Sequence, residues 1–110
     1  MSQRVKKDAA LLRALAQATP KERKALLKAC DISRIRSVCE CAYNVLRGNV
    51  RLSGEQKRKL SKHKKDLRRL VKRGESWVKK RRYLVQKGGG FLLPVLLSAV
   101  LQTVLSQAIN

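Results

Sequence analysis

The side chains best able to do chemistry in this chain are the lysines and arginines between residues 47 and 87. This segment holds 17 Lys and Arg residues against three acids, a net of +14 out of +20 for the whole chain. Cations at this density favour binding to a polyanion. Contacts to nucleic-acid phosphates supply affinity but do not distinguish one base sequence from another. The side chains expected to contact nucleic acid are Lys57, Arg58, Lys59, Lys62, Lys64, Lys65, Arg68, Arg69, Lys72, Arg73, Lys79, Lys80, Arg81, Arg82 and Lys87.

A solvated basic face with a nuclear-localisation patch is the alternative interpretation, because such clusters often serve that purpose. The charge exceeds what solubility requires, and Asp66 is the only acid between Glu55 and Glu75 to offer pairing along a helix. Aromatic residues are few, so platforms for stacking bases are scarce. No C₂H₂ finger, RNA-recognition signature or basic zipper is present. The composition therefore favours non-specific binding of double-stranded DNA.

The three cysteines and the single histidine, His63, are the candidates for a metal site. A structural zinc site needs four ligands, and the spacing of Cys39 and Cys41 puts their sulfurs about 200° apart on a helix. We expect no metal and no cofactor, and we expect Cys30, Cys39 and Cys41 to be small buried or half-buried side chains with free thiols. Catalysis is not expected either, because the chain offers no nucleophile–base pair, no phosphate loop after a strand and no paired carboxylates.

Short amphipathic helices must position these groups. Apolar residues at spacings of three and four predict helices over residues 5–18, 19–30, 31–48, 53–73 and 75–86, and no segment alternates with a period of two. Thr19-Pro20-Lys21-Glu22 and Ser53-Gly54-Glu55-Gln56 have the pattern of a capping box, and Asp31 is suited to an N-cap. The expected fold is all-α, a small cluster of three to four short amphipathic helices with a basic fourth and fifth helix.

The composition changes abruptly at the three glycines, Gly88, Gly89 and Gly90. We divide the chain into an amphipathic helical head (1–52), a basic helical region (53–87), a glycine hinge or cleavage step (88–90) and a separate apolar helix (91–110), which has no ionisable side chain. Three glycines in a row form either a hinge or an accessible, extended site for a protease.

The apolar segment has three possible roles. A helix over residues 91–110 would be about 30 Å long, enough to span a bilayer core. Ser98, Gln102 and Ser106 recur every fourth residue, a pattern also typical of a helix lying on a membrane. The third possibility is a core helix packed under the head. The residues expected to contact a membrane are Phe91, Leu92, Leu93, Val95, Leu96, Leu97, Val100, Leu101, Val104 and Leu105.

The order of basic run, glycines and apolar segment, Lys79-Lys80-Arg81-Arg82 then Gly88-Gly89-Gly90 then residues 91–105, resembles the C-terminal part of the adenovirus core protein X (mu) precursor. That family joins an arginine-rich DNA-condensing peptide to a Gly-Gly step and an apolar, proline-containing tail. The whole chain also resembles small basic proteins of adintoviruses and Polinton (Maverick) elements. The adenoviral similarity covers about residues 79–105, and residues 1–74 have no counterpart in it.

The resemblance implies a protein of the virion core and the host nucleus that condenses double-stranded DNA without sequence preference. It also implies cleavage at Gly88, Gly89 or Gly90 by a viral cysteine protease and a tail that contacts membrane or capsid. One feature departs from the family: the adenoviral protease prefers Met, Ile or Leu a few residues before the glycines, and here three residues separate Leu84 from Gly88.

A second function, from a different class, is a membrane-associated protein, either tail-anchored or membrane-lytic. Its basic run would then bind anionic lipid headgroups instead of DNA. A ribosome- or RNA-associated helical protein is a third alternative, and the apolar segment argues against it.

Overall fold

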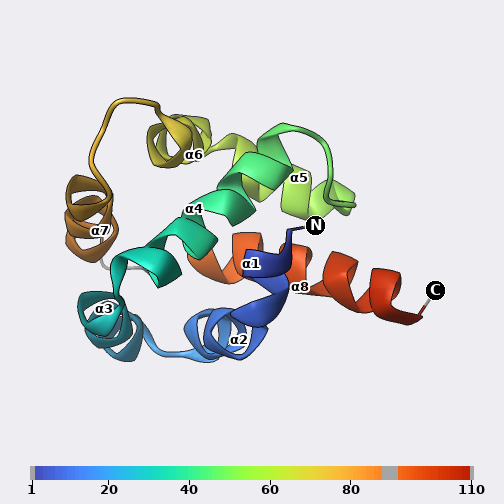
Figure 1. Ribbon diagram of the computed structural model, residues 1–110. Coiled ribbons are helices and arrows are strands. Elements are labelled where there is room, and N and C mark those ends of the chain that lie inside the picture. The colour runs from blue at the N-terminus through green and yellow to red at the C-terminus, as the bar shows by residue number, and fades with distance from the viewer. Residues whose placement is uncertain (1, 88–91, 110) are drawn as a thin grey trace.

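Local sequence signals produce a chain of short helices, as a computed structural model of the protein shows (Figure 1). The structure describes residues 2–87 and 92–109, and within these ranges it contains helices and no strand. This confirms the prediction of an all-α fold. The helices are α1 (Gln3–Lys7), α2 (Ala9–Gln17), α3 (Pro20–Ala29), α4 (Ile32–Leu46), α5 (Gly54–Ser61), α6 (Lys64–Val71), α7 (Trp77–Gln86) and α8 (Leu93–Ile109).

Both predicted capping boxes are present. The hydroxyl of Thr19 accepts a hydrogen bond from the Glu22 N–H at 3.2 Å, and the Glu22 carboxylate accepts one from the Thr19 N–H at 2.9 Å. Ser53 and Gln56 make the same reciprocal pair at the start of α5, at 3.1 and 2.9 Å. Asp31 caps α4 through its carboxylate, as predicted. These side chains satisfy backbone N–H groups that a helix start otherwise leaves without partners.

Two helices predicted to be continuous are interrupted. The stretch over residues 5–18 is broken at Asp8, whose carboxylate instead accepts a hydrogen bond from the Ser37 hydroxyl of α4 at 2.5 Å. The stretch over residues 53–73 is broken around His63, between α5 and α6. Because α5 packs against α8 while α6 packs against α4, the chain bends to follow two different partners.

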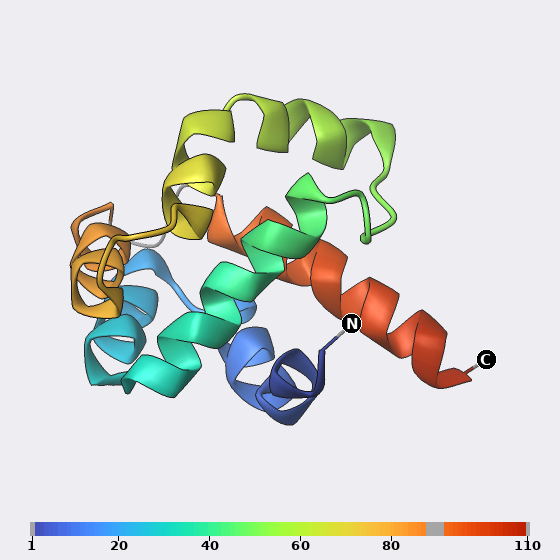
Figure 2. The same cartoon turned by 45° about the horizontal axis from the view of Figure 1, so that its top comes forward.

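The apolar segment forms the centre of the molecule. Helices α4 and α8 cross there, and α2 and α5 also pack against α8 (Figures 1 and 2). Its buried side chains are Leu92, Leu93, Leu96, Leu97, Ala99, Val100 and Leu101. The apolar segment forms a helix of its own, as predicted, but this helix is not detached from the head, since its side chains belong to the same core as those of α2, α4 and α6.

The polar stripe on α8 explains how this helix fits into a core. Ser98, Gln102 and Ser106 are all exposed, so the spacing of four marks a side of α8 that faces solvent. The radius of gyration, 12.8 Å, agrees with the value of about 13 Å expected of a single domain of this length. The helices before and after the glycines thus share one compact fold.

Buried polar side chains reinforce this fold in ways that the sequence pattern does not reveal. The Arg23 guanidinium donates to the Leu15 carbonyl at 2.6 Å and also to the Ala18 carbonyl, so it caps the C-terminal end of α2 from the neighbouring helix. Burial lowers the pKa of Arg23 from its ordinary value. A cation at a helix C-terminus also complements the helix dipole.

The three cysteines are buried with free thiols, which confirms their predicted role as small buried side chains. Burial raises the pKa of all three thiols, that of Cys39 to about 12. Cys39 and Cys41 point to different sides of α4, and both are covered because α4 has helices packed on several sides. Within the described residues, no group of three or more His, Cys, Asp and Glu side chains is arranged to hold a metal ion.

Candidate nucleic-acid interface

Helices α5 and α6 form a bent arm across one side of the molecule (Figure 2). We call residues 54–73 the basic arm. Its inner side buries Leu60, Leu67 and Leu70. The cations of the arm are all exposed: Lys57, Arg58, Lys59, Lys62, Lys64, Lys65, Arg68, Arg69, Lys72 and Arg73. The fold thus gathers ten of the predicted side chains on the outside of one element pair.

Acids in this part of the chain neutralise little of that charge. Glu55 pairs with Lys59 at 3.2 Å, and Glu75 pairs with Arg69 at 3.1 Å. The other eight cations of the arm have no carboxylate within 4.0 Å in the described part of the chain. Exposed ion pairs contribute little to stability, so the arm is not built around internal pairing.

The third acid of the segment, Asp66, joins the arm to the end of α7. Its carboxylate accepts a hydrogen bond from the Tyr83 hydroxyl and lies 3.4 Å from Nδ1 of His63 and 3.8 Å from Nζ of Lys87. The Arg69 guanidinium carbon lies 4.8 Å from the centroid of the Tyr83 ring. Burial, followed by the bond to Asp66, raises the pKa of Tyr83 to about 12. Asp66 therefore fixes the arm relative to α7.

The cations of α7 divide into two groups. Lys79 and Arg82 are exposed and extend the charged surface beyond the arm. Arg81 is half-buried and donates to the Cys30 carbonyl at 3.1 Å. Lys80 is only 4% exposed, and its Nζ lies 4.3 Å from the centroid of the Trp77 ring. Sequence reasoning placed all four on a DNA-binding face, but Lys80 is turned into the fold.

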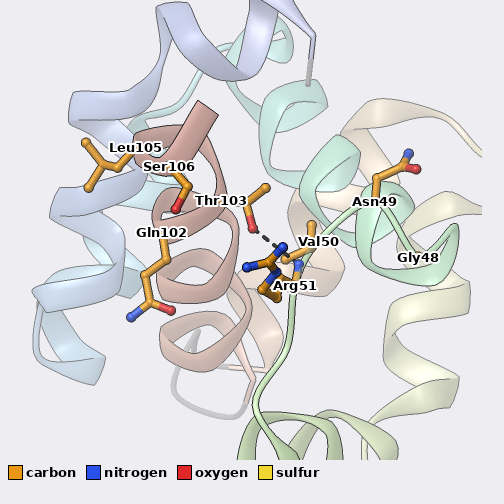
Figure 3. Close-up of a pocket in the computed structure, with 8 residues that line it drawn as sticks. All are labelled: Gly48, Asn49, Val50, Arg51, Gln102, Thr103, Leu105 and Ser106. Atoms are coloured by element: carbon orange, nitrogen blue, oxygen red, sulfur yellow. Dashed lines mark hydrogen bonds between the residues drawn. The ribbon is translucent and has the colours of Figure 1, made fainter. Parts of the chain in front are cut away.

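A hollow lies where the loop after α4 crosses α8 (Figure 3). Its volume is about 910 Å³, and Arg51 is the one ionisable residue that lines it. The Arg51 N–H donates to the Thr103 hydroxyl at 3.3 Å and holds the loop on the helix. Nothing among its lining side chains forms an acid–base or nucleophilic arrangement, so it supports no catalytic interpretation.

The residues predicted to contact a membrane lie mainly inside. Leu92, Leu93, Leu96, Leu97, Val100 and Leu101 are buried, Val95 and Val104 are half-buried, and Leu105 is 50% exposed. Phe91 and the predicted cleavage step, Gly88 to Gly90, lie outside the described residues. In residues 2–87 and 92–109, no helix combines the length and the apolar character needed to cross a bilayer.

The geometry thus gives a basic surface on a helical scaffold whose core includes the apolar segment. The resemblance to the adenovirus core protein X precursor stays a prediction from residues 79–105. We compared the chain with protein-family models, curated proteins and solved structures, and none of them matches it significantly.

Proposed function

We propose that this protein binds double-stranded DNA without sequence preference, through the basic arm and the outer face of α7. The observation that carries the proposal is the set of eight exposed cations on the arm that have no carboxylate partner in the described structure. A duplex presents phosphates along both strands, and cations that meet them release the condensed counterions. Packing of Leu60, Leu67 and Leu70 against the core orders the helices that carry these cations.

The biological setting that we propose is the virion core and host nucleus of an adenovirus-like virus or Polinton-type element. The resemblance over residues 79–105 supports this setting, together with the density of positive charge. Neutralising phosphates along a duplex would allow the DNA to condense.

Cleavage at Gly88 to Gly90 by a viral cysteine protease remains part of the proposal, with a changed consequence. Seven apolar side chains of residues 92–101 are buried against the rest of the protein. A cut before them breaks one peptide bond and removes none of these contacts. The cleaved protein should therefore stay together until it is unfolded, rather than release a tail to membrane or capsid at once.

In a tail-anchored or membrane-lytic protein, α8 would have to leave the core to enter the lipid. Burying a leucine side chain is worth about 1.5–3 kcal/mol relative to exposing it, and four leucines between residues 92 and 97 are buried. Insertion of the apolar face of α8 into lipid would have to recover this free energy. Burial of these side chains therefore argues against insertion of α8 into a membrane.

Salt dependence of DNA binding tests the proposal. Full-length protein is titrated into a labelled duplex at several salt concentrations, and binding is followed by fluorescence anisotropy. With eight phosphate contacts, the slope of log K against log salt should be about −7. Substituting Lys57, Lys64, Lys65 and Arg68 together by Gln should reduce its magnitude by about 4.

A matched control removes the same number of positive charges from helices α1 to α3. Lys6, Arg13, Lys21 and Lys24 are exposed on or beside α1 to α3, and their joint replacement by Gln should leave the slope nearly unchanged. Equal losses in the two variants would mean that the arm is not the interface. Absence of duplex binding at physiological salt, or tighter binding to anionic lipid vesicles than to duplex, would overturn the proposed function.

A further inference from the structure

A second cationic feature lies under α7 and is distinct from the outer face of the basic arm. It is a cavity of about 270 Å³ between α1, α4, α6 and α7. Three cations, Arg4, Arg36 and Lys80, line it together with one carboxylate, Glu40. The rings of Tyr43 and Trp77 line it as well. The cavity therefore combines aromatic faces with an excess of positive charge.

The charge balance of the cavity leaves room for an anion. Arg4 lies 4.0 Å from the Glu40 carboxylate, so this acid is already paired with one of the three cations. Lys80 is 4% exposed, and the described structure gives its ammonium no carboxylate, only the Trp77 ring. The neighbouring Cys39 thiol supplies no negative charge, because burial raises its pKa to about 12. A largely buried cation with no carboxylate beside it is a favourable place for an anionic ligand.

The aromatic rings narrow the class of anion. The Arg36 guanidinium carbon lies 5.3 Å from the centroid of the Trp77 ring, so this ring is in contact with two cations. Tyr43 is 46% exposed at the mouth of the cavity, with the Arg47 guanidinium carbon 5.7 Å from its ring. A nucleobase stacks well on such rings and on guanidinium planes.

We infer that this cavity binds a single 5′-nucleotide that is not stacked in a duplex, with its phosphate near Lys80 and Arg36 and its base against the aromatic rings. The volume lies just below the range of about 300–1,000 Å³ typical of small-molecule sites, which suits one nucleotide and excludes a duplex. The inference deepens the proposed function by adding a subsite for unpaired nucleic acid beside the duplex-binding arm.

Trp77 is the only tryptophan of the chain, so its fluorescence reports this cavity alone. Titration of the full-length protein with deoxyadenosine 5′-monophosphate should quench it saturably. Deoxyadenosine and inorganic phosphate should each bind at least tenfold more weakly, because each supplies half of the ligand. Phosphate that binds as tightly as the nucleotide would identify a mere anion site and overturn the inference, as would the absence of saturable quenching.

Two variants locate the site. Lys80→Met keeps an unbranched apolar stem against Trp77 and removes the charge, and it should weaken binding of the nucleotide at least tenfold. Lys24→Met, at an exposed position of α3 that does not line the cavity, should leave binding of the nucleotide unchanged. Arg36→Gln changes an exposed side chain, so it tests the same cavity with a folded protein if Lys80→Met unfolds. Unchanged nucleotide affinity in both cavity variants would contradict the assignment.

Competition identifies the source of the nucleotide. Displacement of the bound nucleotide by a single-stranded oligonucleotide, and not by a blunt duplex, would assign the site to DNA strands. If neither the oligonucleotide nor the duplex displaces the nucleotide, the site is assigned to free nucleotides. Each of these two results supports the nucleotide site. Duplex binding is measured by anisotropy on the same samples, which separates the test of the arm from the test of the cavity. A protein that binds the nucleotide but no duplex would contradict only the proposed function, and one that binds duplex but no nucleotide would contradict only the nucleotide site.

Discussion

The basic arm and α8 are both amphipathic, but the polar side is the larger one in the arm and the apolar side is the larger one in α8. The arm exposes ten cations and buries three leucines, whereas α8 is almost wholly apolar and exposes a narrow stripe of Ser98, Gln102 and Ser106. A chain with a net charge of +20 repels itself, which disfavours a compact state. The buried surface of α8 opposes that repulsion. The uncharged segment is therefore the part that holds the charged helices together.

The largest expected effect comes from removing α8. A chain that ends at Lys87 loses the seven buried side chains of residues 92–101. Since domains of this size are stable by only about 5–15 kcal/mol, we expect the shortened chain to lose its cooperative thermal transition and its near-UV circular dichroism. A shortened chain that melts cooperatively near the full-length temperature would show that α8 is an accessory after all.

A smaller effect should follow from single changes on the two sides of α8. Leu97→Ala removes a fully buried side chain and should lower the free energy of unfolding by about 2–5 kcal/mol. Ser98→Ala, at the next and exposed position, should change it by less than about 0.5 kcal/mol. Denaturant unfolding at neutral pH measures both. Similar losses in the two variants would contradict the orientation of α8.

The smallest effect concerns the link from the arm to α7. Folding raises the pKa of Tyr83 from 10 to about 12, so the neutral phenol is the form that the fold favours. The associated stability is present below pH 10 and is lost as the pH rises through 12. Tyr83→Phe should therefore lower the melting temperature slightly at neutral pH, and the difference from the unchanged protein should shrink between pH 10 and 12. A difference that stays constant over this range would argue that Asp66 and Tyr83 are not coupled.

Local signals carried most of the helix prediction. The capping boxes at Thr19 and Ser53, and the cap at Asp31, are read directly from neighbouring residues and are all present. The breaks at Asp8 and His63 could not be predicted this way, because they depend on partners distant in sequence, such as Ser37 for Asp8. The burial of α8 was equally hidden, since an apolar helix with a polar stripe fits a membrane surface and a protein core alike.

The cationic residues of the candidate interface could be predicted from the composition, but the orientation of each side chain could not. Counting charges identifies residues 57–73 as a cationic surface, and the structure exposes every cation among them. Nothing in Lys79-Lys80-Arg81-Arg82 reveals that the second lysine turns inward. That orientation depends on Trp77 of the same helix and on cavity residues from α1 and α4. Arg23, which caps α2, escaped prediction for the same reason.

The crossing of α4 and α8 has a consequence for how the protein is made. Helix α8 follows every cationic helix in the chain, so it leaves the ribosome after them. Until then α2 and α4 lack the partner that completes their burial, and the pairing of α2 with α8 closes a loop of most of the chain. Such long-range contacts slow folding. The cationic helices are therefore synthesised before their core can be completed, and the order of translation makes full compaction a late event.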